Sequence, residues 1–126
     1  MNGSGRAGVG ATVLAWLALL PAPAPAGEAG VPLRVMSFNI RVDLPSDGPN
    51  AWPQRRQKAA SMIRFHRADL VGLQEALSGQ VADLEAALPG FLGLGAGRDA
   101  DGGGERSAIL YRRARLELLE QGTFWL

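Results

Sequence analysis

Apolar positions gather in two short runs, separated by a longer stretch in which they recur at helical spacing. The first run, residues 33–40 (LRVMSFNI), follows a proline and precedes a segment rich in Pro, Gly, Asp and Asn, so it predicts a buried strand that ends in a loop. The second run, residues 69–75 (DLVGLQE), has a similar length and apolar content. The segment between them, 53–67, begins with a proline and predicts an amphipathic helix. Its apolar side is expected to carry Ala59, Met62 and Ile63. This order indicates a βαβ unit with parallel strands.

The rest of the chain predicts another helix, a loop and a hairpin. Leucine and valine recur at helical spacing over residues 77–88, and a Pro-Gly pair ends that helix. Residues 95–105 (GAGRDADGGGE) contain too much Gly and Asp for a regular element and predict a mobile surface loop. Two apolar segments follow, 106–113 and 116–126, and the two residues between them suit a β-hairpin.

The first 26 residues have the layout of a secretory signal peptide. One positive charge, at Arg6, precedes an apolar run over residues 9–20, and small residues occupy the last three positions. Twelve residues of helix span about 18 Å, less than the ~30 Å hydrocarbon core of a bilayer, so a stable membrane span is disfavoured. We therefore expect export to the periplasm or beyond the cell, a short linker over residues 27–32, and a single domain over residues 33–126.

The composition excludes several kinds of site. Of the 126 residues, 47% are hydrophobic and 20% are charged, which allows one domain at most. The formal net charge of +1 gives no broad basic surface for non-specific binding of nucleic acid. The absence of cysteine excludes disulfides and thiolate metal sites, and a single histidine, His66, excludes a multi-histidine metal site within this chain. His66 is expected in the first helix, where a packed or surface role is usual.

Asn39 and Glu75 stand near the ends of the two predicted parallel strands. Neighbouring strands lie about 5 Å apart and ligands collect beyond their carboxyl ends, so an amide oxygen and a carboxylate could meet at one edge of the sheet. Such hard oxygen donors suit Mg²⁺, which keeps several waters and takes one or two carboxylates together with substrate phosphates. The structural alternative is a turn at Asn39 and a strand end at Glu75, and the spacing alone favours that alternative.

The glycine-rich loop adds two candidate polar groups. Arg98 could hold a phosphate with its two-pronged guanidinium, and Glu105 could accept a hydrogen bond from an imidazole and fix its tautomer. The loop has neither the Gly-Lys-Ser/Thr ending of a P-loop nor the acidic spacing of an EF-hand. Taken without further information, it is a solvated loop. The basic residues of the first helix are likewise interpreted as its solvent-facing side: Arg55, Arg56, Lys58, Arg64 and Arg67.

Six short segments follow one another in an order that is more specific than any one of them. They are SFNIR (37–41), WPQRR (52–56), DLVGLQE (69–75), GRDADGGGE (97–105), SAILYRR (107–113) and GTFWL (122–126). Together they resemble the endonuclease/exonuclease/phosphatase family, and its exported bacterial members in particular. The resemblance covers residues 33–126.

This resemblance implies both a fold and an activity. The implied fold is α/β, the N-terminal portion of a four-layer sandwich in which helices flank two packed β-sheets. The implied activity is hydrolysis of phosphate esters with Mg²⁺ or Mn²⁺, the ester being a small molecule, a lipid head group or a nucleic acid. Asn39 and Glu75 match the family's metal-holding residues, Glu105 matches the glutamate that orients a catalytic histidine, and Arg98 falls in the substrate-facing loop.

The family pattern is incomplete in this sequence. The family's catalytic histidine, its Asp-x-Asn segment and its closing Asp-His pair have no counterpart among the 126 residues, and His66 cannot replace them from the first helix. We therefore expect a truncated domain that is inactive alone, because loss of such groups removes several powers of ten in rate. We also expect bare strand edges and uncovered apolar faces.

Two other functions are compatible with the residues. The chain could be a secreted, non-enzymatic binding or structural module that has kept the framework and lost the catalytic part. It could also be a carbohydrate-acting hydrolase with Glu75 and Glu105 as paired carboxylates, which requires the two groups to lie about 5 to 10 Å apart. Within the phosphoesterase hypothesis, a phosphomonoester or a small phosphodiester is the preferred substrate, and the near-neutral charge argues mildly against long nucleic acids.

Overall fold

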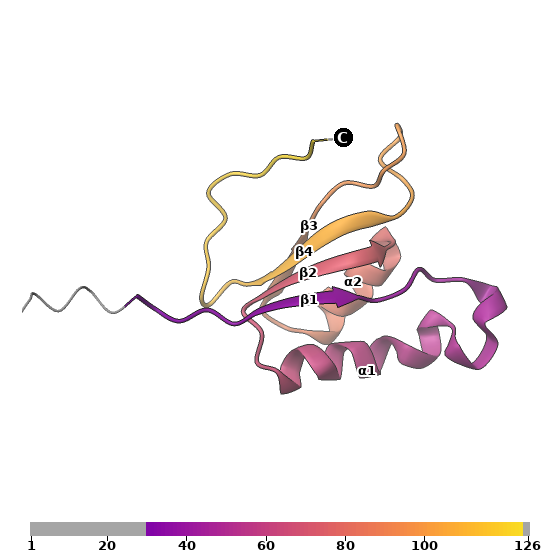
Figure 1. Cartoon of the computed structure of the whole chain (residues 1–126), viewed down its shortest axis with the longest axis horizontal. Helices are drawn as coiled ribbons and strands as arrows, with labels where there is room; N and C mark the ends of the chain where they lie inside the picture. Colours follow the sequence, from indigo (N-terminus) through magenta and orange to yellow (C-terminus); the bar gives the residue numbers. More distant parts are fainter. Residues whose placement is uncertain (1–29, 125–126) are drawn as a thin grey trace, which may run out of the picture. The chain divides into compact units, whose positions relative to one another are not determined.

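A four-stranded sheet and two helices form the framework of the chain. The computed structural model describes residues 30–124, so the expected signal peptide lies outside the described residues. In chain order the elements are β1 (Val35–Asn39), the 3₁₀ segment η1 (Pro45–Asn50), α1 (Trp52–Phe65), β2 (Leu70–Ala76), α2 (Ser78–Ala87), β3 (Phe91–Leu94) and β4 (Arg106–Arg112) (Figure 1). The predicted α/β class and the helices and first two strands are confirmed.

The strand order in the sheet is β1-β2-β4-β3. β1 and β2 are parallel, with Val35 opposite Leu70 and Asn39 opposite Gln74, and α1 is the crossover between them. β4 runs antiparallel to both β2 and β3. The predicted βαβ unit is therefore present, and the carboxyl ends of β1 and β2 lie at the same edge of the sheet.

The predicted hairpin is wrong at its second strand. β4 forms as expected, but residues 116–124 form no strand. The chain turns directly after β4, where the amides of Arg115 and Leu116 both donate to the carbonyl of Arg112, at 2.9 and 3.0 Å. Because β4 already pairs with β2 on one side and β3 on the other, the following segment has no free edge of β4 to join. The short apolar stretch of residues 91–94, for which no element was predicted, is the strand that occupies this edge.

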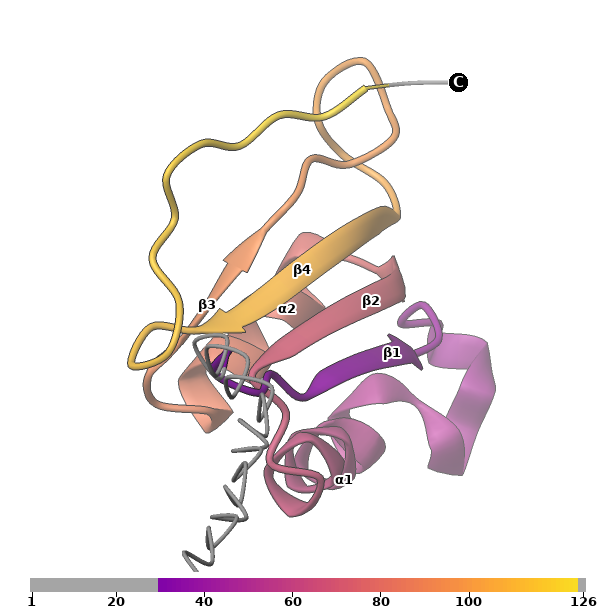
Figure 2. The same cartoon turned by 60° about the vertical axis from the view of Figure 1, so that its left-hand side comes forward.

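Both helices pack against one face of the sheet, and the core lies between them. Figure 2 shows α2 behind β2 and β4, and α1 beneath β1. The core is made of alternate strand residues and of the inner sides of the helices: Val71, Leu73, Ala108, Leu110, Ala60, Ile63 and Leu84, all essentially inaccessible to solvent. Met62 was expected on this inner side but is 43% exposed, because the smaller Ala59 and Ala60 make the close approach together with Ile63.

The opposite face of the sheet carries exposed apolar side chains. Val35 is 69% exposed and Ile109 is 44% exposed. The segment 116–124, yellow in Figures 1 and 2, runs along this side, and its residues line a cavity of about 990 Å³ together with Leu70, Ile109 and Tyr111. Within residues 30–124, no helix has the length and apolar character needed to cross a membrane.

Candidate functional site

Asn39 and Glu75 meet at the carboxyl edge of the parallel strands. Asn39 is the last residue of β1, and Glu75 is the second-last residue of β2. The Nδ2 of Asn39 donates a hydrogen bond to Oε1 of Glu75 at 2.7 Å. The structure thus brings together the two residues that the sequence singled out, although they are 36 positions apart in the chain.

A β-bulge turns Glu75 toward this edge. Its backbone lies in the left-handed region, with φ of 58°, and the pairing of β2 with β4 shifts between Leu73 and Ala76. Leu73 and Ala76 both point into the core, so two residues separate these inward positions where regular alternation allows one. Without the bulge, strict alternation would have directed Glu75 into the helix-covered core. A left-handed glutamate costs roughly 1–2 kcal/mol, which the surrounding structure must compensate.

The loop after β1 fixes the remaining oxygens of the pair. Oε2 of Glu75 accepts a hydrogen bond from the amide of Val42 at 3.3 Å, and Oδ1 of Asn39 accepts one from the amide of Arg41 at 2.8 Å. An ionised carboxylate has about four acceptor positions and an amide oxygen has two. Lone pairs therefore remain on both side chains, at the open edge of the sheet.

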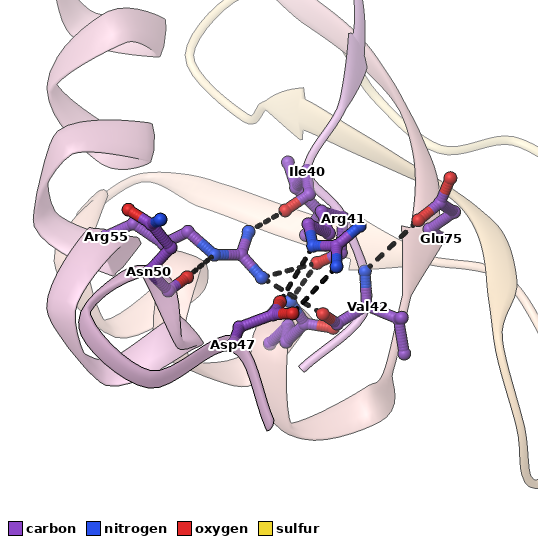
Figure 3. A network of polar contacts seen from close by, with 8 residues as sticks. Ile40, Arg41, Val42, Asp47, Asn50, Arg55 and Glu75 are labelled. Atoms are coloured by element: carbon purple, nitrogen blue, oxygen red, sulfur yellow. Dashed lines mark hydrogen bonds and ion pairs between the residues drawn. The ribbon is translucent and has the colours of Figure 1, made fainter. Parts of the chain in front are cut away.

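Arg55, in the first turns of α1, holds this loop in place. Its guanidinium donates to the carbonyls of Ile40, Arg41 and Val42, the last two at 2.9 and 3.0 Å, while its Nε donates to the carbonyl of Asn50 at 2.7 Å (Figure 3). The same guanidinium lies 5.3 Å from the ring centroid of Trp52. The interpretation of Arg55 as part of a solvated helix face is therefore wrong: its fork satisfies carbonyls that no strand partner takes.

Gln80 supports the loop from the other helix. This side chain is 1% exposed, and its Nε2 donates to the carbonyl of Arg41 at 2.9 Å. Its Oε1 accepts from the amides of Asp43 and Leu77 at 3.2 and 3.0 Å. Gln80 was not among the residues predicted for the site, although the sequence holds a signal for it. It lies three residues after Leu77 and four before Leu84, so helical spacing places an amide on the buried side of α2.

The electrostatics keep Glu75 ionised and available. Hydrogen bonds from Asn39, first, and from the amide of Val42 lower the pKa of Glu75, and the charges of Arg41 and Arg55 act in the same direction. Arg41 itself pairs with Asp47 through two contacts of 2.7 Å and lowers the pKa of that carboxyl. Within the described residues Glu75 takes part in no ion pair. A half-buried carboxylate without a cationic side chain bound to it is suited to a divalent cation.

The donor set fits a hard cation with few protein ligands. Asn39 and Glu75 offer oxygens only, and oxygen donors are the ligands of Mg²⁺ and Mn²⁺. Over residues 30–124 there is no cluster of three or more His, Asp or Glu side chains that could form a fuller cage. Mg²⁺ binds through one or two carboxylates and keeps its other positions for water and phosphate, so this pair meets its minimum requirement.

Glu105 is the last residue of the glycine-rich loop and contacts Arg98, which lies near the start of the same loop. Nη1 of Arg98 donates to Oε2 of Glu105 at 3.4 Å, and the amide of Arg98 donates to the carbonyl of Glu105 at 3.0 Å. Glu105 directly precedes Arg106, which pairs with Ala76. Glu105 therefore lies at the same edge of the sheet as Glu75, but no contact joins it to Asn39 or Glu75.

His66 lies away from this edge. It caps the carboxyl end of α1, shortly before β2 begins, and is therefore beside the amino end of β2. The single histidine of the sequence is thus separated from Glu75 by the length of β2, in agreement with its predicted place in the first helix.

A family model and several solved structures match the chain. The model of the endonuclease/exonuclease/phosphatase family matches residues 36–122. The chain therefore belongs to the endonuclease/exonuclease/phosphatase family. No curated protein sequence matches it.

The solved structures agree with this assignment. An endonuclease/exonuclease/phosphatase from Bacteroides vulgatus is 41% identical, with a TM-score of 0.71 over 74% of this chain and 36% of that one. A mannosyl-6-phosphatase from Bacteroides thetaiotaomicron is 38% identical, with a TM-score of 0.68 over 72% of this chain and 35% of that one. A family protein from Bacteroides thetaiotaomicron is 39% identical, with a TM-score of 0.68 over 71% and 33%. The chain thus spans about a third of the length of these neighbours, and its sheet and helices represent part of their fold.

Proposed function

We propose that this protein is a metal-dependent hydrolase of phosphate esters in which Asn39 and Glu75 hold Mg²⁺ or Mn²⁺. The observation that carries the proposal is the 2.7 Å contact between these two side chains at the carboxyl edge of parallel β1 and β2. Family membership supports it, because the family comprises nucleases and phosphatases. The lowered pKa of Glu75 supports it further, because metal ligands must be deprotonated.

Each candidate residue has a distinct task in this proposal. Glu75 supplies the charged ligand, and Asn39 orients that carboxylate and offers its own oxygen. When bound, the divalent cation neutralises the phosphate oxygens. Arg98 holds the substrate phosphate, and Glu105 orients a catalytic imidazole. His66 is at the wrong end of the sheet for that last task, so we expect the 126 residues alone to bind metal without turning over substrate.

We further propose export and a small substrate. The layout of residues 1–26 supports export through a cleaved signal peptide, followed by a linker to residue 32 and a domain over residues 33–126. A phosphomonoester is the preferred substrate. The formal net charge of +1 offers no general attraction to long nucleic acids, and one neighbour at 38% identity is described as a mannosyl-6-phosphatase. A sugar phosphate is therefore the first substrate to test.

Binding of Mn²⁺ tests the metal site without requiring activity. We expect the 126-residue chain to bind Mn²⁺. The binding is measured as a decrease in the electron paramagnetic resonance signal of the free ion. The variant Glu75→Gln should lose this binding, whereas Glu117→Gln, an exposed glutamate in the segment after β4, should retain it. Equal binding by both variants would refute the metal site. Cooperative melting without any Mn²⁺ binding would favour a non-enzymatic module.

A chimera tests the activity. Residues 33–122 would replace the matching portion of the Bacteroides thetaiotaomicron mannosyl-6-phosphatase, so that the remaining catalytic groups come from a neighbour at 38% identity. We expect Mg²⁺-dependent release of phosphate from mannose 6-phosphate, and its loss with Glu75→Gln. A folded chimera that remains active with Glu75→Gln would contradict the assigned role.

A further inference from the structure

A second polar cavity lies at the opposite end of the sheet from Asn39 and Glu75. Arg34 precedes β1, Asp69 precedes β2, and Arg112 is the last residue of the antiparallel β4. At about 3.3 Å per residue, Asp69 and Glu75 are separated by about 20 Å of strand. The cavity has a volume of about 510 Å³. Its charged lining consists of Arg34, Arg64, Arg67, Asp69, Arg112 and Arg115.

The single carboxylate of this cavity is already neutralised. Asp69 is 4% exposed, and its Oδ2 accepts a hydrogen bond from the amide of Arg34 at 3.1 Å. Its oxygens also lie 3.5 Å from Nε of Arg112 and 3.9 Å from Nη1 of Arg115. Two guanidiniums thus balance one carboxylate, and the cavity keeps an excess of positive charge.

Three of the arginines have a structural role, because their guanidiniums donate hydrogen bonds to backbone carbonyls. Arg64 donates to the carbonyl of Ala87 at 2.8 Å, Arg112 to that of Ala68 at 2.9 Å, and Arg115 to that of Pro32 at 2.8 Å. These are the sole three arginines of the cavity lining whose guanidiniums reach an acceptor within residues 30–124.

Arg34 and Arg67 are different. Their guanidiniums make no hydrogen bond or ion pair with a described residue, and both side chains are exposed. Hydrogen bonds of the backbone nevertheless fix the positions from which these two side chains extend. Arg67 follows the end of α1 with φ of 51° and its amide donates to the carbonyl of Arg64 at 3.0 Å, while the carbonyl of Arg34 accepts from the amides that begin β2.

The floor of the cavity is apolar. Leu88 and Phe91 are buried there, and the guanidinium of Arg112 lies 5.1 Å from the ring centroid of Phe91. An apolar floor lowers the local dielectric and strengthens the attraction between the arginines and an anion. The planar fork of a guanidinium matches two oxygens of a phosphate.

We propose that this cavity binds a phosphate group, either as inorganic phosphate or as the phosphate of a small ester, with Arg34 and Arg67 as its forked donors. A phosphate group neutralises the excess positive charge, and the apolar floor contacts the carbon skeleton of an ester. The site uses none of the residues assigned to the metal, so it does not depend on the proposed hydrolase function.

Calorimetric titration of the full chain tests this proposal. Inorganic phosphate and glycerol phosphate would be titrated separately in the presence of EDTA, so that no divalent cation contributes. We expect both to bind, and we expect Arg34→Gln/Arg67→Gln to weaken binding at least tenfold. Arg34→Lys/Arg67→Lys should also weaken binding, because lysine keeps the charge but lacks the fork. Tighter binding of glycerol phosphate than of inorganic phosphate would support use of the apolar floor.

The controls separate this site from bulk charge and from the metal site. Arg56→Gln/Lys58→Gln removes the same charge from the outer side of α1 and should leave the affinity unchanged, as should Glu75→Gln. Absence of phosphate binding by the unaltered chain would overturn the proposal, and so would equal weakening by the Arg56/Lys58 control. Binding of an oligonucleotide or an anionic vesicle through Arg34 and Arg67, without binding of either phosphate probe, would also overturn it.

Discussion

The guanidinium of Arg55 donates to the carbonyl of Ile40, so the first turns of α1 fasten the chain at the point where it leaves β1. The carbonyls of the next two residues accept from the same side chain. The amide of Arg41 orients Asn39, and the amide of Val42 binds Glu75. The geometry of the candidate metal site therefore depends on a residue that touches neither of the proposed ligands.

Replacing Arg55 with lysine tests this dependence. An ammonium cannot reach several carbonyls that a planar fork serves together, so Arg55→Lys should lower the free energy of unfolding by about 1–2 kcal/mol and weaken Mn²⁺ binding. Urea denaturation and Mn²⁺ titration measure the two effects. The neighbouring Arg56→Lys should change stability by less than about 0.5 kcal/mol. Similar effects of the two variants would refute the proposed support.

Gln80 gives a second prediction. Gln80→Leu fits the space but leaves the amides of Asp43 and Leu77 without their partner and removes one of the two donors to the carbonyl of Arg41. We expect a loss of about 1–3 kcal/mol in the free energy of unfolding. Gln57→Leu, on the exposed side of α1, is the matched control and should be nearly neutral in the same urea titration. If Gln80→Leu were as stable as that control, the loop would not depend on the buried amide.

The bond between Asn39 and Glu75 predicts a pH effect. Because the pKa of Glu75 is lower in the folded than in the unfolded chain, its contribution to stability is full above the ordinary glutamate pKa and is lost as the pH falls through the lowered value. Asn39→Leu removes the largest cause of that lowering. In the variant the pH-dependent contribution of Glu75 to stability should therefore be smaller, whereas protonation of the folded carboxylate, and with it the acid loss of Mn²⁺ binding, should begin at a higher pH.

At neutral pH, Asn39→Leu should also weaken Mn²⁺ binding, by about 10- to 100-fold. Asn50→Leu is the control, because Asn50 contributes only its backbone carbonyl to the site. If Mn²⁺ binding had the same pH dependence in the unaltered chain and in Asn39→Leu, Asn39 would not lower the pKa of Glu75.

The left-handed backbone of Glu75 predicts a difference between two substitutions that both remove the carboxylate. Glycine accepts φ of 58° without strain, whereas alanine keeps its Cβ. Glu75→Gly should therefore be more stable than Glu75→Ala by about 1 kcal/mol, and neither should bind Mn²⁺. Urea denaturation of the pair checks this. Equal stability would mean that the bulge relaxes when the glutamate is removed.

The sequence predicted the parts of the fold that rest on local pattern. The apolar runs located β1 and β2, the helical spacing located α1 and α2, and the chain order of these elements indicated the parallel pair that brings Asn39 and Glu75 to one edge. The second strand of the hairpin was wrong because strand pairing is a competition among distant segments. β2 and β3 occupy both edges of β4, and no local pattern reports that competition.

The residues that support the site could not be predicted from the sequence for a similar reason. Arg55 has the same local pattern as its exposed neighbour Arg56, and only the path of the loop after β1 gives it four carbonyls to bind. The bulge at Glu75 was equally invisible, since DLVGLQE reads as an uninterrupted strand. Its proposed role depends on that irregularity, because a regular strand would have buried the carboxylate.

The place of β4 between β2 and β3 has a consequence for the nascent chain. A ribosome releases β1, α1, β2, α2 and β3 before it releases β4, so the edge with Asn39 and Glu75 can assemble while the far side of β2 still has no neighbour. At roughly 5–20 residues per second, synthesis of residues 77–112 takes about 2–7 s. During that interval an unpaired backbone edge is open to strands of other polypeptides, and the arrival of β4 closes it.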